Sequence, residues 1–205
     1  MEIQEKNVLA AYEVADESGK NLLKTLFPSV TFGQQEAKDN RPVTERIKTF
    51  EDACKELGDN HPFVINYKNM LSVATREDFM DEGWGADMVA YAKLRIICAA
   101  LNEGWEPQFD EDEERWYPWY WLYTQEELND KSEDWYKNRA FRKVGDEGDY
   151  KATGYCGFAY ANSTNTPSNT AACIGSRLCL KDENTATYCG TQFADLWADF
   201  YLIRK

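Results

Sequence analysis

The chain has 205 residues, of which 43% are hydrophobic, and it carries a formal net charge of −13 at pH 7. Seven Trp, twelve Tyr and ten Phe supply ample apolar surface for a packed core, which argues against a chain that is disordered throughout. The negative field repels phosphate backbones, so we expect no nucleic-acid partner.

Residues 1–27 show a rough apolar stripe at helical spacing, although Gly19 interrupts it and Pro28 stops it. Residues 28–42, PSVTFGQQEAKDNRP, have the composition of a linker. We predict one N-terminal helix, which either docks on a neighbour or packs on its own domain.

The next 60 residues predict a helical region. One helix runs from Thr44, as its N-cap, to Gly58, and a shorter segment, PFVINYKNML, follows. A strong helix spans Ala86 to Leu101 and ends before Gly104, because its apolar residues recur at steps of three and four. The stretch between them, SVATREDFMDEGWG, predicts a loop with a Trp plug.

An aromatic segment, WEPQFDEDEERWYPWYWLYT, follows Gly104. Pro118 excludes an ordinary helix or central strand, so we expect an extended or bent segment that joins the two halves. Rings at this density favour a domain core that includes Trp119. One or two exposed rings at the rim of a carbohydrate site are the alternative.

The C-terminal part mixes short elements. Thr124 and Glu127 form a capping box for the helix QEELND. RAFRKV and GYCGFAY predict strands, with GDEGDY as a turn between them. IGSRLCLK predicts another strand whose alternate apolar residues point inward: Ile174, Leu178 and Leu180. Asp182 caps a final helix.

These elements predict an α+β fold, with a mainly helical N-terminal half and a small antiparallel sheet followed by a C-terminal helix. We divide the chain into an N-terminal helix and linker (1–42), a helical region (43–104) and an α+β ligand-display region packed on it (105–205).

Signatures of enzymes and metal sites are missing. The six cysteines form no CxxC pair, and the single histidine, His61, precedes a proline, so we expect neither a zinc site nor a Cys–His nucleophile. Cys54, Cys98 and Cys189 read as buried thiols, and His61 as a solvated or capping residue. The sequence contains no GxSxG, P-loop, GxGxxG or HExxH motif, so we expect no cofactor.

Two acidic runs, FDEDEERW and VGDEGDY, are typical of solvated faces. Paired carboxylates also serve glycosidases, and clustered oxygens bind Ca²⁺ weakly, so both alternatives stay open. A glycosidase requires a cleft that holds two of these carboxylates, drawn from residues 110–114 and 146–149.

The segment from Tyr155 to Ser176 carries no charge and is rich in small polar residues. Asn, Ser and Thr favour turns, so we predict a long loop from Tyr160 to Cys173. Two interpretations stay open: a plain hairpin loop, or a recognition loop that presents adaptable hydrogen bonds to a partner.

Several blocks resemble proteins encoded by phages and prophages of gut Bacteroidales: ERIKTFEDACKELG, AYAKLRIICAALNEGWEPQF, WYPWYWLYT and IGSRLCLKDENTATYCGTQFADLWADF. The resemblance covers about residues 44–203. The block before GSRL also resembles the variable repeat of diversity-generating retroelement targets. Those proteins typically display a C-type-lectin-like domain on a virion or cell surface.

The resemblance implies a set of ligand contacts. Random copying of template adenines converts Asn codons into many others, and Tyr155, Cys156, Ala172 and their neighbours fit that spectrum. GFAYAN and IGSRL would then be the invariant framework. The implied contacts are Tyr155, Cys156, Tyr160, Asn162, Thr164, Asn165, Ser168, Asn169, Ala171 and Cys173.

We therefore predict a non-enzymatic phage or prophage display protein that recognises a host-surface protein or glycan. We expect no signal peptide and no membrane insertion, and a location in the virion or the host cytoplasm. The alternative is a virion structural component, such as a head decoration or tail connector, whose loop contacts neighbouring subunits. A carboxylate-based carbohydrate enzyme is the third candidate. Whether the chain is a homo-oligomer stays open.

Overall fold

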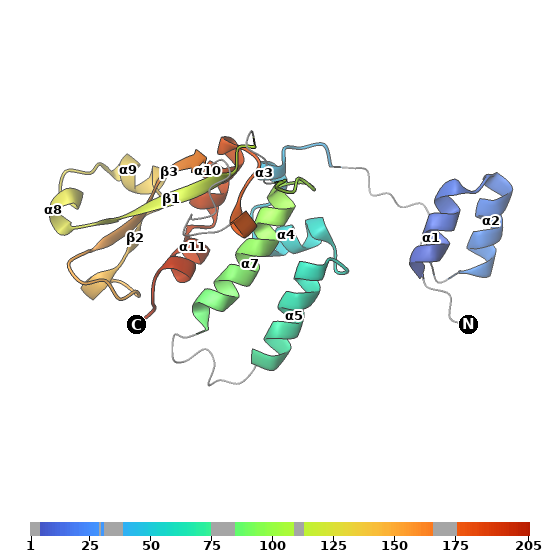
Figure 1. The fold of residues 1–205 in the computed structure, drawn as a ribbon, viewed down its shortest axis with the longest axis horizontal. Coiled ribbons are helices and arrows are strands. Elements are labelled where there is room, and N and C mark those ends of the chain that lie inside the picture. Colours follow the sequence, from blue (N-terminus) through green and yellow to red (C-terminus); the bar gives the residue numbers. More distant parts are fainter. Residues whose placement is uncertain (1–4, 29, 31–38, 75–84, 109–112, 166–175) are drawn as a thin grey trace. The chain divides into compact units, whose positions relative to one another are not determined.

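The computed structural model describes residues 5–28, 30, 39–74, 85–108, 113–165 and 176–205 (Figure 1). They form helices and a three-stranded antiparallel sheet, which confirms the predicted α+β class. The chain divides into two compact units, Met1–Arg41 and Pro42–Lys205.

The N-terminal unit holds two helices where one was predicted: α1 (Glu5–Val14) and α2 (Glu17–Leu26). The break lies at Asp16, whose backbone is extended and whose side chain accepts a 2.8 Å hydrogen bond from the Gly19 amide. A side chain that caps a new helix in this way ends the preceding one. Gly19 therefore lies inside α2 and interrupts nothing.

The larger unit begins with helices, and their bounds are α3 (Val43–Arg46), α4 (Phe50–Leu57), α5 (Pro62–Ala74) and α7 (Ala86–Leu101). The N-cap of α4 is Thr49, not Thr44, because Thr49 forms a capping box with Asp52. Gly58 closes α4 with a φ of +82°, as predicted. The predicted Trp plug, Trp84, falls outside the described residues.

Helix α7 matches its predicted bounds, and it forms the centre of the helical layer. Its Leu94, Ile97 and Leu101 are fully buried. Beyond its end, Asn102 is buried and its side-chain amide bonds both the Cys179 carbonyl and the Lys181 amide, each at 3.0 Å. These bonds tie the helical layer to the C-terminal part of the chain.

The sheet consists of β1 (Trp116–Tyr123), β2 (Arg142–Lys143) and β3 (Gly157–Asn165), in the order β1-β3-β2. Strand β1 is therefore an edge strand, which explains how it contains Pro118. Trp116 exchanges backbone hydrogen bonds with Leu180 at 3.0 and 2.9 Å on the side away from β3. Because backbone directions alternate along a strand, the missing N–H of Pro118 also points away from β3.

The predicted loop over residues 160–173 is wrong for its first six residues, which continue β3 to Asn165. Their backbone groups pair with β1 from Tyr120 back to Trp116, so the sheet supplies the bonds that a loop would seek in turns. The register shifts between Trp119 and Tyr120, which leaves Ala161 as the extra residue of a β-bulge.

The predicted strand IGSRLCLK is also wrong. Residues Ser176–Leu178 form a short 3-10 helix, η2, and only Leu180 makes a bridge with β1. Ile174 falls outside the described residues. The predicted turn GDEGDY contains a second 3-10 helix, η1 (Gly145–Glu147), and the predicted strand RAFRKV shortens to the two residues of β2.

The remaining helices are α8 (Gln125–Leu128), α9 (Glu133–Asn138), α10 (Glu183–Gln192) and α11 (Ala194–Tyr201). The capping box of Thr124 with Glu127 and the Asp182 N-cap are confirmed. The single final helix that was predicted bends at Phe193, where the backbone leaves helical geometry.

Helices α10 and α11 lie between the sheet and α7 (Figure 1). The core that they share includes the fully buried Trp197 from α11, Ile97 from α7 and Leu180. The predicted regions 43–104 and 105–205 thus pack around common apolar residues in one unit.

Candidate functional site

Strand β1 has one buried face and one that is partly open. Pro118, Tyr120 and Leu122 point toward α10 and α11, and Tyr120 stacks on Phe158 of β3 with ring centroids 4.6 Å apart. These aromatic rings belong to the core, as predicted. The inner face of the sheet therefore packs on the core and supports the side chains of the outer face.

The outer face exposes two tryptophans. Trp119 and Trp121 are 41% and 64% exposed, so the predicted core position of Trp119 is wrong. Alternation along the strand explains the difference, because α10 covers only the even-numbered side chains of β1. Buried Tyr117 bounds the exposed rings at one end, and Tyr123, whose ring packs edge-on against Trp135 at 5.1 Å, bounds them at the other.

An amide accompanies the two indoles. Asn162 of β3 is the register partner of Trp119, and its side chain is exposed. Paired residues of an antiparallel sheet share a face, with Cβ atoms about 5 Å apart. We call Trp119, Trp121 and Asn162 the outer-face patch. Thr164, the partner of Tyr117, is half-buried beside it.

The bulge next to Asn162 is held in place from the α9 side. The Arg139 guanidinium donates a hydrogen bond to the Ala161 carbonyl, and the Tyr160 amide donates to the Arg139 carbonyl at 2.8 Å. A bulge redirects the side chains around it. Arg139 therefore fixes the direction in which Asn162 leaves the strand.

Tyr160 does not fit the ligand-contact role that the resemblance implies, because it is 6% exposed. Its hydroxyl lies 2.9 Å from Ser163 Oγ and donates to Thr187 Oγ1 of α10 at 3.0 Å. This buried hydroxyl cluster joins β3 to α10. Tyr160 supports the patch from beneath.

The structure does not gather the other implied contacts. Tyr155 is exposed and Cys156 half-buried at the start of β3, where the Cys156 amide bonds the Tyr123 carbonyl at 2.8 Å. Half-buried Asn165 lies at the opposite end of β3, about 26 Å from Gly157 at ~3.3 Å per strand residue. The remaining implied contacts fall outside the described residues: Ser168, Asn169, Ala171 and Cys173.

The acidic run near β2 points into solvent, with Asp146, Glu147 and Asp149 all exposed. Where the pKa of a described carboxyl group departs from its usual value, it is lowered, as for Glu147 by its hydrogen bond to Lys143. A glycosidase acid requires the opposite shift. Within the described residues, no three His, Cys, Asp or Glu side chains gather as a metal site would require.

The thiols and the histidine hold structural positions. Cys98 and Cys189 are buried, as predicted, whereas Cys54 is half-buried. A hydrogen bond between the thiols of Cys98 and Cys189, together with burial, raises the pKa of Cys98. Burial raises the pKa of Cys179 to about 11. His61 accepts a hydrogen bond from the Phe63 amide at 3.2 Å, which confirms a capping residue.

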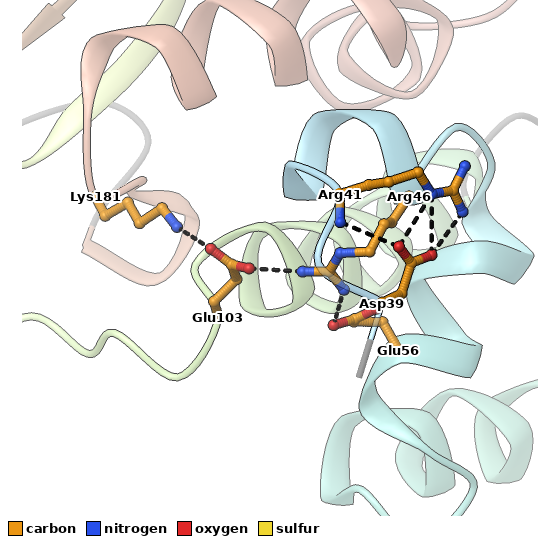
Figure 2. A network of polar contacts seen from close by, with 6 residues as sticks. All are labelled: Asp39, Arg41, Arg46, Glu56, Glu103 and Lys181. Atoms are coloured by element: carbon orange, nitrogen blue, oxygen red, sulfur yellow. Dashed lines mark hydrogen bonds and ion pairs between the residues drawn. The ribbon is translucent and has the colours of Figure 1, made fainter. Parts of the chain in front are cut away.

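A polar network lies near the C-terminal end of α7 and joins residues from α3 and α4 to the segment before α10. Glu103 binds Arg46 and Lys181, each at 2.6 Å, and Arg46 also pairs with Glu56 (Figure 2). These ion pairs lower the pKa of Glu103. Figure 2 also draws Arg41 with Asp39, a pair that belongs to the N-terminal unit.

Comparisons with protein-family models, curated proteins and solved structures found no match to this chain. The phage-protein resemblance and the lectin-like arrangement therefore stay predictions. Within the described residues, every helix falls short of the length and apolarity that crossing a bilayer requires.

Residue types in β1 hardly indicate the outer-face patch. WYPWYWLY has an aromatic residue at nearly every position, so its alternation of buried and exposed faces is invisible in residue type. Pro118 was the one available signal, because proline in a strand indicates an edge.

Proposed function

We propose that the protein is a non-enzymatic phage or prophage recognition protein that binds a neutral host-surface glycan through its outer-face patch. The observation that carries the proposal is the exposure of Trp119 and Trp121 on an edge strand, with Asn162 beside them. Large apolar rings exposed together commonly mark a binding surface.

The chemistry of the patch favours a sugar. Indole rings are flat and apolar, and they pack against the C–H face of a pyranose ring, while an amide both donates to and accepts from sugar hydroxyls. Trp119 and Trp121 are two residues apart on one strand, about 6.5 Å, so the two rings lie side by side on one face. The net charge of −13 disfavours anionic glycans.

Rigidity beneath the patch supports recognition. The Tyr120–Phe158 stack and the Tyr160–Ser163 hydroxyl contact lie directly under the strands that carry it. Exposed rings on a pre-organised support lose little conformational entropy on binding. Asp146, Glu147 and Asp149 of the second acidic run are exposed to solvent, which favours binding without hydrolysis.

The test is a screen of neutral bacterial-surface oligosaccharides, followed by calorimetry on the best ligand. Trp121→Ala should weaken binding at least about tenfold, which is ~1.4 kcal/mol. Met88→Ala is the matched control, because Met88 is 52% exposed on α7 and should leave the affinity unchanged. Absence of binding to any neutral glycan, or equal affinities of Trp121→Ala and wild type, would refute the proposal.

A virion structural role is the second candidate, favoured by the same exposed edge strand. A neighbouring subunit would then cover the patch. In that case the wild-type protein would bind no glycan in the screen, and Trp121→Ala would prevent incorporation of the protein into particles.

A further inference from the structure

The two N-terminal helices leave most of their apolar side chains uncovered. Among the described residues of this hairpin, 5–26, Val8 alone is buried, and α2 has no buried residue. Four large apolar side chains are between 36% and 87% exposed: Leu9, Val14, Leu22 and Leu26. A helix pair of this kind lacks a core of its own.

Because the hairpin is small, it is only marginally stable by itself without a core. Each helix has ten residues, and isolated helices shorter than about 12–15 residues are marginal in water. Units below roughly 40 residues usually need disulfides, a metal or association. Residues 1–41 contain no Cys and no His, so association is the remaining route.

The internal contacts of the hairpin show which face of α2 does not contact α1. The ammonium groups of Lys20 and Lys24 lie 5.8 and 5.4 Å from the ring centre of Tyr12 on α1. Leu22 and Leu26 lie one turn apart on the other side of α2, about 120–160° around the helix from the lysines. The Leu22–Leu26 face therefore points away from Tyr12.

Charge favours a second copy of the hairpin over the larger unit of the same chain as the occupant. Residues 1–41 hold seven acidic and five basic residues, a net charge of −2, which leaves −11 of the total for residues 42–205. Helix α2 has Glu17 in its first turn and Lys24 in its last. Two α2 helices packed antiparallel therefore bring ends of opposite charge together, and their helix dipoles oppose as well.

The same charges argue against a membrane. Helices that lie on a bilayer carry Lys- and Arg-rich polar faces, whereas this hairpin has no excess of positive charge.

We propose that the N-terminal hairpin self-associates about a two-fold axis, with the Leu22–Leu26 face of α2 packed against the same face of a second copy. The product is a four-helix arrangement of two hairpins, a common closed form for short antiparallel helices. This dimer carries two copies of residues 42–205. A surface that binds its ligand weakly in one copy therefore gains avidity when both copies bind. This inference stands independently of the proposed glycan site.

The first experiment measures the mass of the full chain by light scattering at about 100 μM, far above a micromolar Kd. Wild type should be a dimer, and Leu22→Asp with Leu26→Asp should be a monomer. Ile203→Asp is the control, because Ile203 is 63% exposed in the larger unit, and this variant should stay dimeric. A monomeric wild type, or a dimeric double variant, would overturn the proposal.

A second experiment covers the case in which the double variant unfolds. Leu22→Cys places a thiol at the proposed interface, and Lys20→Cys places one on the side that faces Tyr12. Under mild oxidation Leu22→Cys should cross-link between copies at least about tenfold faster than Lys20→Cys, with wild type as the background for native thiols. Equal rates would contradict the predicted face.

Discussion

The Tyr120 hydroxyl donates a 2.7 Å hydrogen bond to the carbonyl oxygen of Gly190, which connects β1 directly to α10. The contact is this close because residue 190 has no side chain. A Cβ there would lie 2.5 Å from Pro118 Cβ and 2.9 Å from Tyr160 Cδ2. The sheet that carries the outer-face patch thus packs directly against Gly190 of α10.

Gly190→Ala should therefore destabilise the protein by about 1–3 kcal/mol, because the added methyl overpacks the contact with β1. Helix propensity alone predicts the opposite sign, since Ala exceeds Gly by up to ~1 kcal/mol within a helix. Urea unfolding checks the sign. Asn184→Ala, an exposed change on the same helix, is the control and should change stability by less than about 0.5 kcal/mol.

The tryptophans differ sharply in burial, and their truncation should reflect it. Trp197 is 0% exposed, so Trp197→Ala should cost about 3–5 kcal/mol. Trp119 is 41% exposed on an edge strand, so Trp119→Ala should cost less than about 2 kcal/mol. Thermal and denaturant unfolding measure both. Similar losses would mean that Trp119 is covered in solution.

Neighbouring residues of β3 should separate binding from stability. Asn162 is exposed, so Asn162→Ala should change unfolding free energy by less than about 0.5 kcal/mol while weakening glycan binding. Ser163 is buried against the Tyr160 and Thr187 hydroxyls, so Ser163→Ala should cost about 1–3 kcal/mol. If Asn162→Ala destabilised the protein as much as Ser163→Ala, or left glycan binding unchanged, the assignment of faces would be wrong.

Glu103 should make the free energy of unfolding depend on pH in the acid range. Ion pairs with Lys181 and Arg46 lower its folded pKa, so its stabilising contribution is present above the unfolded value of about 4.5. That contribution is lost as the pH falls through the folded pKa. Glu103→Gln should flatten the stability curve below pH ~4.5, and the exposed Glu114→Gln should not. Because Glu103 is half-exposed, the effect at neutral pH should stay below about 1 kcal/mol.

Local hydrogen bonding made several elements readable from the sequence. The capping box of Thr124 with Glu127 and the Asp182 N-cap each join residues three apart, so nothing distant can change them. Helix Ala86–Leu101 was readable for a similar reason, because its apolar spacing is a property of one segment.

Tertiary structure decided the rest through partners far away in the chain. Residues 160–165 have the composition of a turn, yet pairing with β1, about 40 residues earlier, makes them a strand, because an unpaired backbone costs more than poor strand propensity. The exposure of Trp119 and the inward orientation of Tyr120 depend on which face of β1 α10 covers. That choice is made by long-range packing, and residue type in WYPWYWLY carries no trace of it.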